Sequence, residues 1–204
     1  MPLKSNVSLT ILASCLFAAP AFAGYEYPLP SPEIRNAYFL GRGTDSRAAE
    51  FLATYKHWFT PPQTYRYLIT EVEVLTPYAQ VVQRGEDNIP NDSEVQTETD
   101  LRAHPLRFLV KVSITFNAAI VYDATEENGA PDGGRTFSAE LAQAHKIEPV
   151  RTEVEPIYEK HGPGGIIMTL DADPTKITSA PLHITVRTPD GKSLSAEFDL
   201  SKLK

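Results

Sequence analysis

Cysteine is almost absent from this chain: its 204 residues contain one, Cys15. A single thiol cannot form a disulfide within the chain, so the small disulfide-stapled scaffolds are excluded as a class. The fold must therefore be stabilised by a hydrophobic core.

An apolar run long enough to cross a membrane is also missing. The run at residues 9–22 is shorter than the roughly 18 to 20 residues that a bilayer-spanning helix needs. It follows the basic Lys4 and ends at Ala21-Phe22-Ala23, with small residues at the positions that signal peptidase requires. We therefore predict a signal peptide at residues 1–23 and an exported protein, either periplasmic or extracellular.

A lipid anchor on Cys15 is the alternative, because Leu12-Ala13-Ser14-Cys15 fits the pattern after which bacterial lipoproteins are cut and acylated. The apolar run continues past Cys15, however, whereas a lipidated cysteine should end it. Cleavage after Ala23 would leave no cysteine, which excludes thiol catalysis. The remaining chain has the length of one domain of about 180 residues.

Acidic residues outnumber basic ones: the chain has 19 lysines and arginines and 26 aspartates and glutamates, which gives a net charge of −7. A negative surface repels phosphate backbones, so we expect no nucleic-acid partner. Acidity of this size is ordinary for a soluble protein and identifies no ligand.

Known catalytic motifs are missing as well. The chain has no G-x-S-x-G elbow, no H-E-x-x-H pair and no P-loop. Its five histidines lack the close spacing of metal sites, which favours surface or structural roles. A hydrolase would need some of them to meet a carboxylate in space, and the candidates are His57, His104 and His161 with Glu98 or Asp100.

The N-terminal part of the predicted mature chain, residues 24–63, reads as an extended lead-in followed by helix. The prolines up to residue 32 disfavour a helix before Ser31. We expect Ser31 to cap a short helix, with Pro32 in its first turn and glycines 41 and 43 at its end.

A second helix is predicted behind Asp45 or Ser46 as its cap, with Pro61 and Pro62 as its end. Apolar residues recur at three- and four-residue spacing and give it one apolar face. They are Ala48, Phe51, Leu52, Tyr55 and Phe59.

After residue 63 the apolar period changes to two, which is typical of half-buried antiparallel strands. The clearest case is residues 106–116, where every even position is apolar. Shorter alternations surround Val72, Leu141, Val154 and Met168.

The last strands form a hairpin, because residues 182–186 and 194–200 alternate on one face with Pro189-Asp190-Gly191 between them. Proline and aspartate suit the centre of a type I turn, and Gly191 suits the left-handed residue that follows. The ending TPDGKSLSAEFDL, residues 188–200, resembles hairpins of immunoglobulin-like or fibronectin-like modules. This resemblance covers one hairpin and brings no functional residue with it.

We therefore predict a mainly β protein, an antiparallel β-sandwich of immunoglobulin-like or fibronectin-like type over residues 64–204, with one or two short N-terminal helices packed on the sheet. Residues 84–105 are the main irregular segment, rich in acidic residues. Within it, Ser93 and Gln96 fit a capping box for a brief helix.

One loop carries oxygen ligands of the kind that calcium prefers. It spans residues 123–134 and lacks the ligand order of an EF-hand, and the same residue types are common in hairpin loops. Calcium is thus a candidate here, and no other cofactor is indicated. The candidate ligands are Asp123, Glu126, Glu127, Asn128 and Asp132.

Aromatic residues gather around two prolines in YKHWFTPPQTYRY, residues 55–67. If exposed, Tyr55, Trp58, Tyr65 and Tyr67 are suited to stacking on sugars or docking an extended peptide. The favoured interpretation is that these aromatics pack the helix onto the sheet. Similarly, HGPGG at residues 161–165 is either an anion-binding loop or, more simply, a tight turn.

Two classes of function follow. The first is an exported, non-catalytic binding or assembly module of the cell envelope or extracellular space, with a protein or glycan partner. The alternative is a hydrolase that acts on an envelope or extracellular polymer. Convergence of a histidine and a carboxylate in one pocket would favour the hydrolase.

Overall fold

The computed structural model describes residues 24–87, 93–117, 136–159 and 162–204. The predicted signal peptide, Cys15, His161 and the five candidate calcium ligands lie outside these residues. The described part contains the helices α1 (Ser31–Gly41), α2 (Arg47–Ala53), α3 (Pro77–Glu86) and α4 (Glu94–Ala103), and the short 3₁₀ helix η1 (Pro174–Lys176). Its strands are β1 (Lys56–Trp58), β2 (Tyr67–Leu75), β3 (Phe108–Phe116), β4 (Ser138–Ala142), β5 (Lys146–Ile147), β6 (Arg151–Glu159), β7 (Gly162–Ala172), β8 (Pro181–Arg187) and β9 (Ser193–Asp199).

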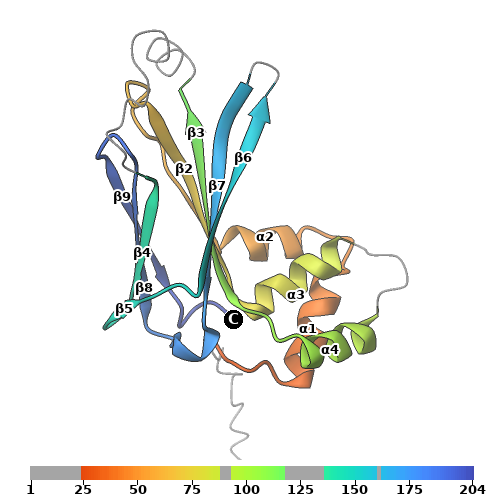
Figure 1. Ribbon diagram of the computed structural model, residues 1–204. Coiled ribbons are helices and arrows are strands. Elements are labelled where there is room, and N and C mark those ends of the chain that lie inside the picture. The colour runs from red at the N-terminus through yellow and green to blue at the C-terminus, as the bar shows by residue number, and fades with distance from the viewer. Residues whose placement is uncertain (1–23, 88–92, 118–135, 160–161) are drawn as a thin grey trace, which may run out of the picture.

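The protein is mostly β, as predicted, and its sheets are antiparallel. One sheet has the strand order β1-β2-β3-β7-β6 and the other the order β5-β4-β8-β9. Figure 1 shows the two sheets beside each other, with the four helices gathered at one end of the larger sheet. Side chains from both sheets and from the helices belong to one hydrophobic core.

The period-two patterns predicted the strand faces correctly in the middle of each sheet. Phe108, Val110, Val112 and Ile114 of β3 are all 0% exposed. The closing hairpin is also confirmed: β8 pairs with β9, and Gly191 in the turn has a φ of 80°, which an L side chain rarely adopts.

Strand β6 differs from the expectation that one of its faces is buried. Val154 pairs with Met168 of β7 and shares its face, yet Val154 is 50% exposed whereas Met168 is 1% exposed. The reason is that β6 is an edge strand, so its alternation continues the pattern of the sheet beyond the part that the core covers.

Both N-terminal helices form, with two corrections to their ends. Pro30, not Ser31, is the N-cap of α1, and the Ser31 hydroxyl instead donates a hydrogen bond to Glu98. Helix α2 ends at Ala53, well before the prolines at 61 and 62, because the chain turns to form β1 beside β2. Phe59 therefore lies beyond β1 and not on the helix.

Helix α3 was missed in the sequence analysis. Its signals are present: Thr76 accepts a hydrogen bond from the Ala79 N–H as N-cap, and Pro77 occupies the first turn. The brief helix predicted at Ser93 exists as α4, where the Ser93 side chain accepts a hydrogen bond from the Gln96 N–H.

Helices α1 and α3 cross in close contact where each has a glycine. A Cβ atom on Gly41 would lie 2.0 Å from the Val82 carbonyl oxygen, and one on Gly85 would lie 2.6 Å from that of Tyr38. The crossing holds the helical layer beside the sheet. Among the described residues, no helix is long and apolar enough to cross a membrane.

Candidate ligand pocket

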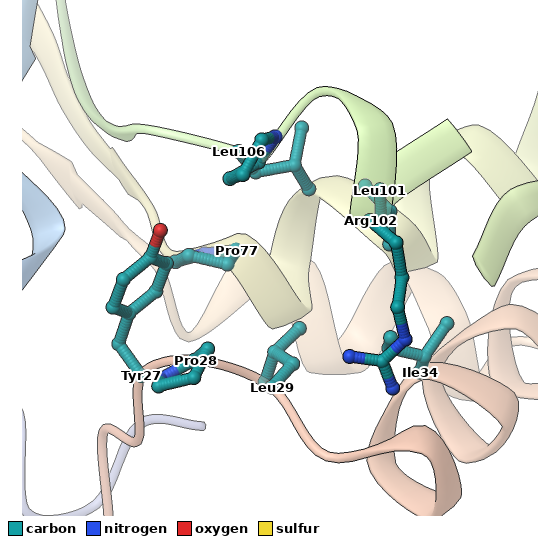
Figure 2. A pocket seen from close by; sticks show the side chains of 9 residues that line it. Tyr27, Pro28, Leu29, Ile34, Pro77, Leu101, Arg102 and Leu106 are labelled. Carbon is teal, nitrogen blue, oxygen red and sulfur yellow. The ribbon is translucent and has the colours of Figure 1, made fainter. Parts of the chain in front are cut away.

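A pocket of about 180 Å³ lies where the lead-in segment, α1, the start of α3 and the end of α4 meet (Figure 2). Its wall is apolar apart from the Tyr27 side chain and one arginine. The lining residues are Tyr27, Pro28, Leu29, Ile34, Pro77, Leu101, Arg102, Pro105 and Leu106.

Hydrogen bonds between the lead-in segment and the C-terminal part of the chain hold the pocket walls in place. The Tyr25 N–H donates to the Leu200 carbonyl at 2.9 Å, and the Tyr25 hydroxyl donates to the Pro174 carbonyl at 2.9 Å, which fixes the lead-in segment. Helix α1 contributes Ile34, which is 3% exposed. The prolines of the wall supply apolar surface without a backbone N–H.

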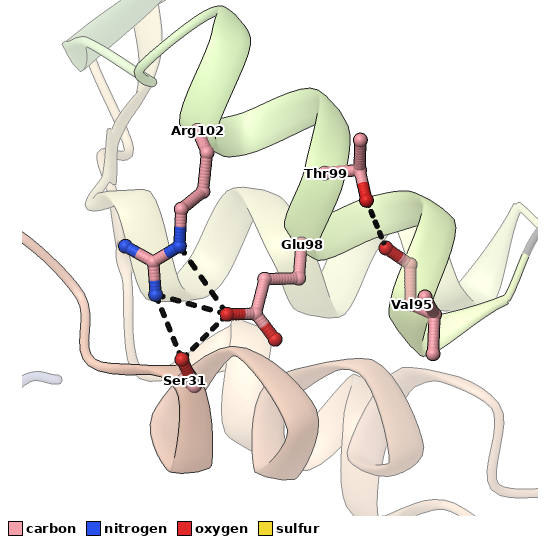
Figure 3. Close-up of polar contacts among 5 residues, drawn as sticks. All are labelled: Ser31, Val95, Glu98, Thr99 and Arg102. Atoms are coloured by element: carbon pink, nitrogen blue, oxygen red, sulfur yellow. Dashed lines mark hydrogen bonds and ion pairs between the residues drawn. The ribbon is translucent and has the colours of Figure 1, made fainter.

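Arg102, in the last turn of α4, is fixed against α1 by a network that Figure 3 shows. Its Nε and Nη2 donate to Glu98 Oε1 at 3.3 and 2.9 Å, and Nη2 also donates to Ser31 Oγ at 2.7 Å. The Ser31 hydroxyl in turn donates to Glu98 at 2.5 Å. Among the residues that the structure describes, none accepts a hydrogen bond from Nη1.

The electrostatics of this network favour the charged form of Glu98. The Ser31 hydroxyl and then Arg102 lower the pKa of Glu98 below its ordinary value of 4.5. Both partners are partly exposed, with 56% of the Arg102 side chain and 36% of the Glu98 side chain accessible. The pair therefore contributes little to stability, and its main effect is to fix the guanidinium at the pocket.

Two other hollows are larger, about 370 and about 270 Å³, but polar and charged side chains line much of each. The larger contains His57, Glu197 and the ion-paired Asp199 and Lys202. Of these three hollows among the described residues, the pocket at Arg102 has the most apolar walls, which is the usual character of a ligand site.

The residues considered for a hydrolase are placed as follows. His57, on β1, packs against the rings of Phe59 and Phe198 at 4.6 and 6.5 Å between centroids. His104 caps α4, and its backbone N–H donates to the Asp100 carbonyl at 2.7 Å. Neither histidine lines the pocket at Arg102.

Both carboxylates of that hypothesis are engaged by other side chains. Glu98 belongs to the Arg102 network, and Asp100 accepts hydrogen bonds from Arg84 and Gln96, each at 2.7 Å. Arg84, Gln96 and the charge of His104 lower the pKa of Asp100. Within the described ranges, no group of three or more histidine, cysteine, aspartate or glutamate side chains is placed to hold a metal ion.

The four aromatic residues considered as an alternative binding surface are divided between the core and the exterior. Tyr55 is 0% exposed and Tyr67 is 9% exposed, and both belong to the core. Trp58 is 66% exposed on β1, with the Lys56 ammonium 5.7 Å from the centre of its ring. Tyr65 lies under Lys192, whose ammonium is 5.0 Å from the ring centre.

Sequence reasoning missed the pocket and Arg102. The pocket's walls come from residues 27–34, 77 and 101–106, which are distant along the chain, and no local pattern links them. Comparison of the chain with protein-family models, with curated proteins and with solved structures finds no match.

Proposed function

We propose that this is an exported, non-catalytic β-sandwich protein, with its two sheets arranged as in immunoglobulin-like or fibronectin-like modules, that binds a partner protein in the cell envelope or outside the cell. The observation that carries the binding role is the pocket at Arg102. It combines apolar walls with a fixed arginine, and no histidine or carboxylate lines it.

The size of the pocket favours one side chain of a partner over a whole small-molecule ligand. Sites for drug-sized ligands enclose about 300 to 1,000 Å³. The volume here is about 180 Å³, close to that of an engineered cavity of about 150 Å³ that holds a benzene molecule in another protein. An aliphatic or phenyl side chain matches this space.

The chemistry of the walls favours a protein over a glycan. A sugar ring carries hydroxyl groups along its whole edge, and each loses its bonds to water on binding unless the site replaces them. Pro28, Pro77 and Pro105 offer no N–H donors, and the side chains of the leucines and Ile34 offer no polar atoms. An apolar side chain makes no hydrogen bonds to water, so it loses none when it enters the pocket.

Export is supported by the signal-peptide layout of residues 1–23, and the excess of acidic residues suits a soluble exported protein. The hydrolase alternative named Glu98 or Asp100 as the acid or base, and both carboxylates are bound to arginines. His57 and Glu197 do line one hollow, but the His57 ring packs against Phe59 and Phe198, and the Glu197 carboxylate lies 3.5 Å from His183.

An NMR titration tests the binding role. We expect N-acetyl-leucinamide to shift the methyl signals of Ile34 and Leu101 saturably, with a dissociation constant on the order of 1 mM for a ligand of this size. N-acetyl-serinamide and glucose should shift neither signal, since they lack an apolar group that fills the pocket.

Matched variants identify the pocket as the binding site. Leu29→Trp fills the pocket and should abolish the shifts. Val95→Trp places the same side chain at a position on α4 that is 68% exposed and should leave them unchanged. The proposal is wrong if wild-type protein shows no saturable shift, or if glucose shifts these signals as strongly as the leucine amide.

A further inference from the structure

Resting on the proposed function, we infer that the pocket receives the C-terminal residue of a partner polypeptide, with its apolar side chain between the walls and its terminal carboxylate on Nη1 of Arg102. This names the chemistry of the partner, which the fold and the shape of the pocket alone leave open.

Arg102 has N–H donors that its network with Ser31 and Glu98 leaves available for a ligand. A guanidinium has five N–H donors and stays charged at any physiological pH. The network uses Nε–H and the two hydrogens of Nη2, so both hydrogens of Nη1 lack an acceptor among the described residues. Arg102 also lines the pocket, and its guanidinium lies beside Leu29 and Ile34 of the apolar walls (Figure 2). A carboxylate is the acceptor that forms the strongest hydrogen bonds with them.

Arg102 is also held in place before any ligand arrives. Ser31 and Glu98 bind one edge of the guanidinium and leave the Nη1 edge open (Figure 3). A long side chain that is already ordered loses less entropy on binding than a free one. The Glu98 carboxylate reduces the net attraction for a second anion, so we expect a moderate gain from the carboxylate.

The short distance between the walls and Arg102 distinguishes a terminal carboxylate from an acidic side chain. In an extended peptide, the neighbouring side chain points to the opposite face, and the next one on the same face is roughly 7 Å farther along. A terminal carboxylate is bonded to the same Cα as the apolar side chain. A pocket of about 180 Å³ that Arg102 itself lines therefore suits a C-terminal residue.

The test compares three probes at neutral pH by the same NMR titration: N-acetyl-leucine, which carries a free carboxylate, N-acetyl-leucinamide, which is its neutral analogue, and N-acetyl-aspartyl-leucinamide, which carries its charge on a side chain. We expect N-acetyl-leucine to bind about fivefold more tightly than the other two, the gain typical of one partly exposed charged pair.

The variant Arg102→Gln should bring the affinities for N-acetyl-leucine and its amide together, because it removes the donors that distinguish the acid from the amide. Far-ultraviolet circular dichroism shows whether the variant is folded. Arg47→Gln is the control, because it removes the same charge from a side chain that is 72% exposed on α2. It should preserve the fivefold ratio.

The outcomes separate this inference from the proposed function. Equal binding of acid and amide to wild-type protein overturns the inference and leaves the pocket as a site for a neutral side chain. Tighter binding of the aspartyl probe also overturns it, in favour of an internal acidic residue. Absence of binding by all three probes contradicts the proposed function itself.

Discussion

Tyr55 shows how a single side chain links distant parts of the chain. It is 0% exposed, and its hydroxyl donates to the Lys204 carbonyl and accepts from the Lys204 N–H, both at 2.9 Å. The Thr76 hydroxyl donates to the same carbonyl. Burial raises the pKa of Tyr55, so the hydroxyl stays protonated and keeps both roles.

Tyr55→Phe should lower the free energy of unfolding by about 1–3 kcal/mol, because it leaves the Lys204 N–H without its acceptor. Tyr158→Phe is the control, since Tyr158 is 74% exposed on β6, and it should change stability by less than about 0.5 kcal/mol. Urea unfolding measures both. A Tyr55→Phe protein as stable as the control would contradict this role.

The Ser31, Glu98 and Arg102 network predicts a pH dependence. Because its folded pKa is lowered, Glu98 contributes stability above its ordinary pKa of 4.5, and this contribution is lost as the pH falls through the folded pKa. Ser31→Ala should therefore raise the pKa of Glu98. It should be less stable than wild type at neutral pH, and the difference should shrink as the pH falls below the ordinary carboxyl pKa of 4.5 and through the lowered folded pKa.

An NMR titration of the Glu98 carboxyl, combined with urea unfolding across the same pH range, checks both effects. Ser193→Ala removes a hydroxyl from an exposed position on β9 and serves as the control. An unchanged pKa of Glu98 in Ser31→Ala would show that the Ser31 hydrogen bond does not stabilise the carboxylate.

At the scale of residues, burial was predictable where the alternation was regular, as in β3. The burial of Tyr55 and Tyr67 agrees with the favoured interpretation that these aromatics pack in the core. Arg102 was not predictable, because its position depends on Ser31, which is far away in the sequence and which we expected to cap α1.

Among the elements, the α1 and α3 crossing is the most sensitive to a small change. Gly→Ala in a helix normally stabilises a protein by about 1 kcal/mol. Gly41→Ala should do the opposite and destabilise by about 1–3 kcal/mol or more, because the new methyl group would overlap the Val82 carbonyl.

Asn36→Ala, on an exposed face of α1, is the control and should leave stability unchanged or slightly raised. Thermal unfolding compares the two variants with wild type. If Gly41→Ala unfolds at or above the wild-type temperature, the helices do not approach as closely as described.

The element predictions failed where a local pattern had two interpretations. Tyr78, Val81, Val82 and Gly85 have helical spacing and are buried in α3. No helix was predicted there, because these residues follow a period-two strand and Gly85 was placed in the irregular segment 84–105. The alternation in β6 was real, but sequence cannot tell an edge strand from a central one. Helix α4 buries only Thr97, so it has no apolar face that a periodic pattern could reveal. The N-cap Ser93 was therefore the main feature of the sequence that predicted this helix.

For the whole molecule, the shared core predicts that helices and sheets unfold together. Residues 24–63 contribute Ile34, Tyr38, Leu52 and Tyr55 to the same core as β2, β3 and β8. Far-ultraviolet circular dichroism and tyrosine signals should therefore report the same urea midpoint. A fragment of residues 64–204 should not fold. Two separate transitions, or a folded fragment, would contradict a single core.

At this scale the β class and antiparallel pairing were predictable from alternation, whereas the binding site was not. Apolar periodicity records which face of a strand is buried. It holds no information about how a lead-in segment, three helices and a connecting turn enclose a space. The pocket depends on these long-range contacts.

The measurement that tests the account most directly is the set of intermolecular nuclear Overhauser effects between N-acetyl-leucine and the protein. The account predicts contacts from the ligand methyl groups to the methyl groups of Leu29, Ile34 and Leu101. Contacts only to exposed apolar residues elsewhere, such as Val154 on β6, would show that the pocket at Arg102 is not the binding site.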